Sequence, residues 1–372
     1  MEIIMWIIGI ILIYLAIKKK MEPALLLPLG FGTILINLPG DTTEKVITHL
    51  FDIGIAEYEL LPLLLFVGLG TMIDFTFLLQ NPKFAVFGLC AQAGILATMG
   101  LAFLIGFPIQ EAASIGIIGA ADGPTAIFVA QILESQYLAA IMVAAYSYMA
   151  LIPIIQPPVI KLLTTKKERQ IKMALPQKII SKKVKIILEN FIQMLKLKSK
   201  GINLFFTDIP IATTIVVSLI APESAILIGF LMFGNLIKEC GVLDSLKETA
   251  QTTLTNLITI FLGLIIASQM RAEYFLQINT LIIIALGLVA FIFDTAGGVI
   301  AAKVINLFSK NKINPMIGAC GISAFPISAK VVQQMGVKED PNNHLIMYAV
   351  AANVSGQIFS VLISGIIIAL CN

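Results

Sequence analysis

One acid stands inside a long apolar part of the chain, among residues that break a helix. Asp122 follows Gly119 and precedes Gly123, Pro124 and Thr125. Breaking a helix frees backbone carbonyls, so a carboxylate here, with the Thr125 hydroxyl, forms an oxygen cage suited to a small cation. An ionised acid in hydrocarbon costs at least ~2.5–3.5 kcal/mol, and intramembrane acids are functional by default. The structural alternative is a cap at the tip of a turn.

A second stretch interrupted by Gly and Pro, residues 314–334, contains no acid. It offers neutral oxygens at Asn314, Ser323 and Ser328, and a cation at Lys330. One carboxylate with several neutral oxygens suits a monovalent cation better than a divalent one. Lys330 either serves this site or snorkels toward the membrane surface.

Further polar residues stand in apolar segments. Asn353, in the last segment, either closes the cage or forms a hydrogen bond between helices. Tyr146 and Tyr148 could orient an acid or carry a proton, or belong to an interfacial aromatic belt. Asp294 is a second intramembrane acid, but no proline breaks its segment, and its small neighbours equally suit close helix packing. Asp122 is therefore the stronger candidate.

The elements that must position these residues are membrane helices. The chain has 372 residues, 58% of them hydrophobic and 13% charged, with a mean hydropathy of +0.96, whereas a soluble chain carries roughly 25% charge. The composition predicts one membrane domain. The predicted membrane segments are 3–18, 22–38, 59–73, 84–106, 137–156, 205–221, 224–237, 254–269, 279–307 and 344–370.

Charge fixes the orientation of these segments. Lys18, Lys19 and Lys20 follow the first apolar run, which indicates an uncleaved helix whose C-terminal end is cytoplasmic. The densest basic stretch, Lys161 to Lys200, must also be cytoplasmic, and the acidic connection 39–60 is placed outside. The number of spans agrees with both cytoplasmic assignments only if 112–131 enters and leaves the membrane on the same side, as a re-entrant hairpin.

The two halves of the chain resemble each other. Five residues recur 202 positions later: Gly116 as Gly318, Gly119 as Gly321, Pro124 as Pro326, Gln131 as Gln333 and Tyr146 as Tyr348. Each half then holds about five transmembrane helices and one broken-helix hairpin, 112–131 or 314–334. Because five is odd, the second half is inverted. The predicted fold is an all-α, multi-pass membrane protein with repeats 1–160 and 205–372 around a basic cytoplasmic linker, 161–204. Secondary transporters use this architecture.

Several classes of function are excluded or lack a signal. The net charge of +3 gives no indication of nucleic-acid binding, and no Walker loop or dinucleotide fingerprint occurs. Four cysteines without CxxC spacing suggest apolar packing residues, and two distant histidines form no metal motif.

Three stretches carry a resemblance to a known family. Gly116 to Thr125 and Tyr146 to Pro158, together with Gly321 to Ala329, resemble the β subunit of the sodium-pumping biotin-dependent decarboxylases, which act on oxaloacetate, methylmalonyl-CoA or glutaconyl-CoA. The resemblance runs from Glu22 to Asn353. It implies that the family's essential aspartate falls on Asp122 and its tyrosine on Tyr148. Its asparagine, glycine and serine fall on Asn314, Gly318 and Ser323. The family commonly has arginine at Lys330, so a bidentate contact there is lost.

The resemblance also implies an activity and partners. This subunit would decarboxylate carboxybiotin, presented by a biotin-carrier protein, and drive sodium outward while consuming a proton. Sodium would bind Asp122, Asn314, Gly318, Ser323 and Asn353. The catalytic residues would be Asp122, Tyr148, Ser323 and Lys330, and Lys330 would also bind the carboxybiotin. The other partners would be a carboxyltransferase (α) subunit and a small single-span γ- or δ-type subunit, in the plasma or inner membrane, with homo-oligomers left open.

Composition and repeats alone suggest a sodium-coupled secondary transporter or antiporter without decarboxylase activity, and a non-catalytic membrane scaffold remains a further alternative. Only the resemblance supplies decarboxylation.

Overall fold

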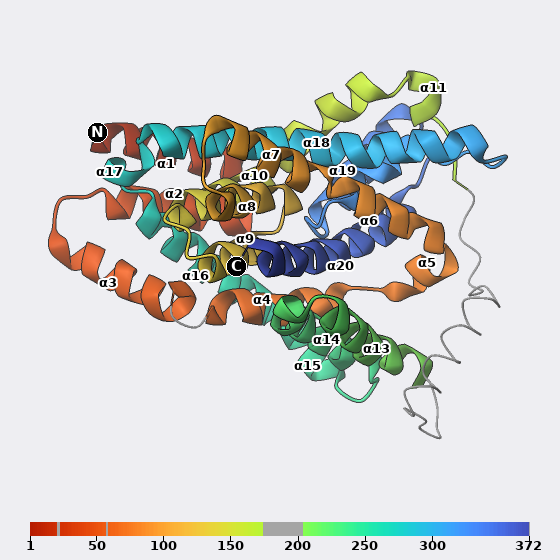
Figure 1. Ribbon diagram of the computed structural model, residues 1–372, viewed down its shortest axis with the longest axis horizontal. Coiled ribbons are helices and arrows are strands. Elements are labelled where there is room, and N and C mark those ends of the chain that lie inside the picture. Colours follow the sequence, from red (N-terminus) through yellow and green to blue (C-terminus); the bar gives the residue numbers. More distant parts are fainter. Residues whose placement is uncertain (21–22, 57–58, 174–203, 372) are drawn as a thin grey trace.

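The protein is helical throughout the part of the chain that the computed structural model describes, residues 1–20, 23–56, 59–173 and 204–371 (Figure 1). Five helical stretches are long and apolar enough to cross a bilayer: Pro82–Ile105, Leu138–Leu163, Asp244–Gln269, Ile278–Phe308 and Ile346–Cys371. Shorter apolar helices lie among them: Pro23–Ile36, Leu60–Met72, Ile109–Ala120, Gly123–Ile132 and Asp208–Ile220. The prediction of an all-helical membrane protein is confirmed across these residues.

The helices follow the apolar segments closely. The first half contains α1 (Glu2–Lys18), α2 (Pro23–Ile36), α3 (Asp41–Phe51), α4 (Leu60–Met72), α6 (Ala85–Ala91), α7 (Ala93–Ile105), α8 (Ile109–Gly116), α9 (Gly123–Ile132) and α10 (Leu138–Leu163). The second half contains α13 (Leu204–Ile220), α14 (Ala225–Glu239), α15 (Asp244–Glu248), α16 (Thr255–Ile266), α17 (Ala272–Phe275), α18 (Ile278–Phe308), α19 (Ile327–Glu339) and α20 (Ile346–Cys371).

One difference from the sequence prediction concerns the acidic connection 39–60. It contains α3 and a π-helical turn, Asp52–Ala56, where the sequence predicted a connection between membrane segments and no helix. The reason is an apolar stripe: Ile47 and Phe51, one helical turn apart, are both buried. α3 packs on α16. Acidic residues of this connection therefore belong to an amphipathic helix that has a buried apolar stripe.

Two helix pairs make matching contacts across the halves. α2 packs on α16, and α14 packs on α4. Asn37, just after α2, donates from Nδ2 to the carbonyl of Met270 at 2.8 Å. Asn235 on α14 donates from Nδ2 to the carbonyl of Ile73 at 2.9 Å. In both cases a buried amide satisfies carbonyls freed where the partner helix ends.

Charged residues gather where α11 (Lys166–Arg169) meets the ends of α18 and α19. Arg169 pairs with Glu339 at 2.7 Å, Lys172 with Asp340 at 2.9 Å and Lys303 with Glu168 at 3.3 Å. α11 lies at the opposite end of the molecule from the N-terminus (Figure 1). The rest of the predicted linker, including Lys178, Lys182, Lys183 and Lys185, falls outside the described residues.

α18 is the element against which both broken segments pack. It runs along one edge of the molecule beside α7 and α10 (Figure 1). Its Gly298 meets Gly318 so closely that a Cβ on either would stand 2.0 Å from the other's carbonyl oxygen. Only glycine at both positions permits this approach. The second broken segment is thereby fixed against α18.

Candidate functional site

The first broken segment consists of α8, a 3₁₀ turn over Ile117–Ala120, and α9. Ala121 then takes a left-handed conformation with φ 58°, which L-residues rarely adopt. Pro124, in the first turn of α9, lacks the N–H that a continuous helix would need. The helix therefore stops at Ala121 and restarts at Gly123, and Asp122 becomes the N-cap residue of α9.

The Asp122 carboxylate lies inside the protein, with 4% of the residue exposed. Its Oδ2 accepts a hydrogen bond from Oγ1 of Thr125 at 2.5 Å. The same oxygen accepts a second bond, at 3.0 Å, from Nε2 of Gln357 on α20. Hydrogen bonds to a charged acceptor contribute about 1.5–3 kcal/mol each. These two donors hold one face of the carboxylate in a fixed orientation.

The second broken segment begins with a 3₁₀ helix, Pro315–Gly321, and continues as α19. Just beyond Gly321, the backbone N–H of Ser323 donates to the carbonyl of Ala120 at 3.2 Å, and the Ser323 hydroxyl donates to the same oxygen. The two segments, far apart in sequence, therefore meet beside Asp122.

α20 closes the arrangement from a third side. Asn353, one helical turn before Gln357, donates from Nδ2 to the carbonyl of Ile322 at 2.6 Å. Its Oδ1 is buried and accepts no hydrogen bond from any described residue. One face of α20 thus holds Asp122 through Gln357 and the second segment through Asn353. A buried oxygen without a hydrogen-bond donor is suited to a cation.

The donor set favours a monovalent cation. It offers one carboxylate, amide and hydroxyl oxygens, and the carbonyls of two broken helices. Divalent cations usually take more carboxylates. Across the described residues, no group of three or more His, Cys, Asp or Glu side chains could hold a metal ion.

Two other predicted sodium ligands belong to the 3₁₀ helix Pro315–Gly321: Gly318 lies within it, and Asn314 is its N-cap residue. Gly318 faces Gly298 of α18 rather than Asp122. Asn314 stands at the start of the helix, about 14 Å from Gly321 at a 2.0 Å rise per residue. Its Nδ2 donates to the carbonyls of Arg169 and Ile171, at 2.8 and 2.9 Å. Asn314 therefore joins this segment to the basic linker.

Of the predicted catalytic residues, neither Tyr148 nor Lys330 forms a hydrogen bond with Asp122 in the described part of the chain. Tyr148 donates from its hydroxyl to the carbonyl of Ile284 on α18 at 2.6 Å. Lys330 is exposed on α19, and its side chain makes no hydrogen bond or ion pair with a described residue. Tyr146 is the tyrosine beside the acid: its ring packs against the Cα of Gly123, and its buried hydroxyl has no described partner.

Sequence reasoning missed two glutamines. Gln357 holds Asp122, and Gln156 on α10 donates from Nε2 to the carbonyl of Ala319 and to the Ser328 hydroxyl, both at 2.9 Å. Gln156 thereby ties the two parts of the second segment together. The signal available for Gln357 was its spacing from Asn353, four residues, which places both amides on one helical face.

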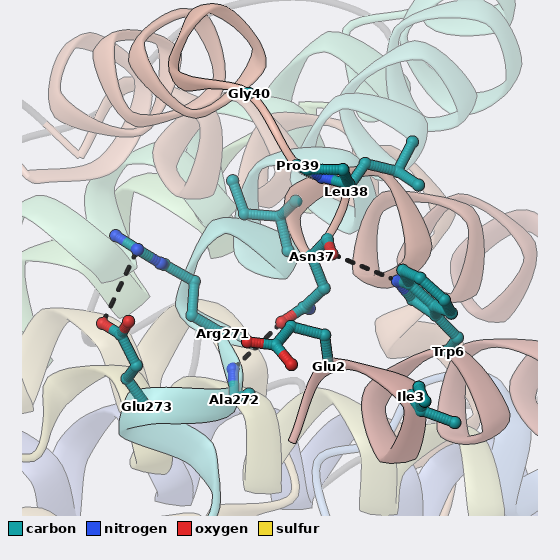
Figure 2. Close-up of a pocket in the computed structure, with 11 residues that line it drawn as sticks. Glu2, Ile3, Trp6, Asn37, Leu38, Pro39, Gly40, Arg271, Ala272 and Glu273 are labelled. Atoms are coloured by element: carbon teal, nitrogen blue, oxygen red, sulfur yellow. Dashed lines mark hydrogen bonds and ion pairs between the residues drawn. The ribbon is translucent and has the colours of Figure 1, made fainter.

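A separate cavity of about 410 Å³ lies at the N-terminal end of the molecule (Figure 2). In it, Trp6 Nε1 donates to the carbonyl of Asn37 at 3.2 Å, and the Ala272 N–H donates to Asn37 Oδ1 at 3.0 Å. Arg271 pairs with Glu273 at 3.6 Å. None of the predicted site residues lines this cavity, and its polar contacts fasten α1 and α2 to α17.

Comparison with known proteins gives a consistent family. The model of the family "Na+-transporting oxaloacetate decarboxylase beta subunit" matches residues 1–371. The chain is 44% identical to the methylmalonyl-CoA decarboxylase β subunit of Veillonella parvula, over 99% of this chain and 92% of that one. It is 44% identical to the glutaconyl-CoA decarboxylase β subunit of Acidaminococcus fermentans, with the same coverage. It is 38% identical to oxaloacetate decarboxylase β chain 2 of Salmonella typhi, over 99% of this chain and 94% of that one.

Proposed function

The chain belongs to the family of β subunits of sodium-transporting decarboxylases, and we propose that it exports sodium at the expense of carboxybiotin decarboxylation, with Asp122 as the sodium-binding carboxylate. The observation that carries the proposal is the meeting of both broken segments and α20 around this one buried acid.

The cage has a definite composition in this proposal. Sodium, as the transported substrate, binds Asp122, the free Oδ1 of Asn353 and the Ser323 hydroxyl. The Ser323 hydroxyl donates to Ala120, which leaves its lone pairs available to a cation. Asn314 and Gly318 act differently from the cage residues: they fix the second segment against the linker and α18.

Release of CO2 from carboxybiotin breaks a nitrogen–carbon bond, and the biotin nitrogen takes up a proton. Moving one sodium ion against 100 mV requires ~2.3 kcal/mol, so transport must be coupled to such an exergonic step. Tyr148 and Ser323 are the proposed proton-handling groups, and the exposed Lys330 is placed to attract the carboxylate of carboxybiotin at the protein surface.

The two halves, residues 1–160 and 205–372, act as inverted repeats joined by the basic cytoplasmic linker 161–204. The matching contacts of Asn37 and Asn235 support this relation, because each binds the end of a helix in the other half. Movement of one half against the other would expose Asp122 alternately to the two sides.

A β subunit works with partner subunits. We propose a carboxyltransferase (α) subunit, a biotin-carrier protein that delivers carboxybiotin, and a small single-span membrane subunit, all at the plasma or inner membrane. The charged cluster of α11 and α19 is the proposed docking side, because the basic linker continues from it.

Reconstitution into vesicles with those partner subunits tests the proposal. Asp122→Asn should abolish sodium-dependent decarboxylation of free carboxybiotin and sodium uptake. Asp244→Asn, at an exposed acid on α15, is the matched control and should leave both intact. Sodium-dependent turnover by Asp122→Asn at the parent rate would refute the proposal. Sodium flux without any biotin protein would instead indicate a secondary transporter.

A further inference from the structure

A second buried acid, Asp294 on α18, has no role in the site described above. The residue is 1% exposed. Across the described residues, neither of its carboxylate oxygens has a hydrogen-bond partner of good geometry. The backbone amides of Gly94 and Ile95, in the first turn of α7, face it. Asp122, by contrast, has two side-chain donors.

The surroundings of Asp294 are shaped to admit its carboxylate. A Cβ on Gly94 would stand 2.0 Å from Oδ1, and a Cβ on Gly119 would stand 3.0 Å from Oδ2. Two glycines on different elements therefore leave the space that the acid fills. α7 begins at Ala93, after a break at Gln92, so the backbone amides of Gly94 and Ile95 lie in its first turn, beside the carboxylate. The Ile95 N–H also donates to the Gln92 carbonyl at 3.1 Å.

This environment selects a proton over a metal ion. A buried, unpaired carboxylate costs several kcal/mol, and such a group takes up a proton instead. The groups that face Asp294 are N–H donors, which repel a metal ion but stabilise the anion at a helix N-terminus. The site can therefore hold the acid in both forms, neutral with a proton and anionic without one.

Asp294 also touches the moving part of the proposed mechanism. Gly119, its neighbour, lies three residues before Asp122 in the first broken segment. Displacement of this segment would remove one wall of the carboxylate's space. A change at Asp122 thus alters the surroundings of Asp294 directly.

We propose that Asp294 is a proton-binding site, distinct from the sodium site, that loads and releases a proton as the first broken segment moves. This proposal rests on the proposed function, since it assigns a carrier for the proton that decarboxylation consumes. Asp294 is the second chemically active acid of a cycle in which Asp122 carries sodium.

Other titratable groups near α18 do not duplicate this one. α7 and the 3₁₀ turn Ile117–Ala120 carry no titratable side chain. The other large elements packed against α18 each carry few titratable side chains. These are Cys90 on α6, Glu111 on α8, Cys320 on the 3₁₀ helix Pro315–Gly321, and Tyr146, Tyr148 and Lys161 on α10. Glu111 already accepts from Ser135 and from the Gln136 N–H.

Infrared difference spectroscopy of the purified chain, recorded as pH is varied, tests the site without any turnover. One carboxyl band that changes with pH should belong to residue 294. This band should be present in the parent and in Asp122→Asn, absent in Asp294→Asn and shifted in position in Asp294→Glu. A spectrum in which no titrating band depends on residue 294 would overturn the proposal.

Sodium transport provides a second test of the proposal. In the reconstituted complex, Asp294→Asn should slow sodium uptake by about 100-fold, the low end of the contribution of a positioned proton carrier, and Asp294→Glu should restore part of it. Parent rates and an unchanged pH profile in Asp294→Asn would refute the proposal. Should Asp294→Asn fail to fold, the band shift in Asp294→Glu decides. A wrong assignment of the sodium site would give a different result: Asp122→Asn would retain sodium uptake.

Discussion

Gln357 Nε2 donates to Asp122 Oδ2 at 3.0 Å, and this bond joins the last helix of the chain to the first broken segment. The acid is therefore not held by its own half alone. Thr125 supplies a local donor, but the second side-chain donor to the carboxylate comes from α20.

Gln357→Leu should weaken sodium binding while preserving the fold. The substitution removes one of two donors from the carboxylate anion, at a cost of about 1.5–3 kcal/mol, which is about a tenfold or greater rise in the half-saturating sodium concentration. The measurement is sodium activation of decarboxylation in the reconstituted complex. Gln277→Leu, at an exposed glutamine before α18, is the control. Equal sodium activation in both variants would contradict this role.

Gly123→Ala should disable the site by steric conflict. A Cβ at this position would stand 2.3 Å from the Tyr146 ring, which is fully buried and has no room to retreat. Overpacking costs about 1–3 kcal/mol, so both thermal stability in detergent and sodium-dependent activity should fall. Gly229→Ala is the matched control: nothing lies within 4 Å of its Cβ, and it should stabilise α14 by about 0.5–1 kcal/mol.

Asn37→Ala and Asn235→Ala should destabilise the protein to similar extents. Each removes a buried amide from carbonyls at a helix end, which costs about 1–3 kcal/mol for the groups left unsatisfied. Thermal unfolding in detergent measures both. Asn279→Ala, which removes an exposed bond to Tyr137, should have little effect. A large loss in one half and none in the other would argue against an equivalent role for the two contacts.

The contact between Lys172 and Asp340 should loosen in acid. The hydrogen bond from Lys172, with that from the Asn342 N–H, holds the pKa of Asp340 below its ordinary value. A lowered folded-state pKa contributes stability above the unfolded pKa, about 3.9, and this contribution is lost as pH falls through the folded value. Lys172→Gln should show the same loosening at neutral pH, read as faster hydrogen exchange across residues 169–173. Hydrogen exchange that is altered neither by acid nor by Lys172→Gln would show that the Lys172–Asp340 ion pair does not hold residues 169–173 in place.

Hydropathy was sufficient to locate the helices, because about 20 apolar residues have few alternatives to a span. Gly and Pro were sufficient to locate the break at Asp122. α3 was not predicted because the five acids of the connection 39–60 obscured a stripe of only two buried residues, Ile47 and Phe51.

The composition of the site was less accessible from sequence. Asn314 and Ser323 are only nine positions apart, yet the 3₁₀ helix between them carries Asn314 to the linker and leaves Ser323 at Ala120. Spacing cannot show such a separation when the intervening conformation is unknown. Gln357 was overlooked because a glutamine in a packed helix commonly bonds to a neighbouring helix, and only tertiary contact identifies its partner as Asp122.

The bond between Asp122 and Gln357 spans 235 positions of sequence, and this separation has a consequence during synthesis. A chain emerging from the ribosome presents Asp122 to the membrane long before α20 exists. Until that helix arrives, the acid has Thr125 as its side-chain donor and lacks both Asn353 and Ser323. If Asp122, Asn353 and Ser323 form the proposed sodium site, an unfinished chain lacks a complete site, and a truncated product should not dissipate the sodium gradient.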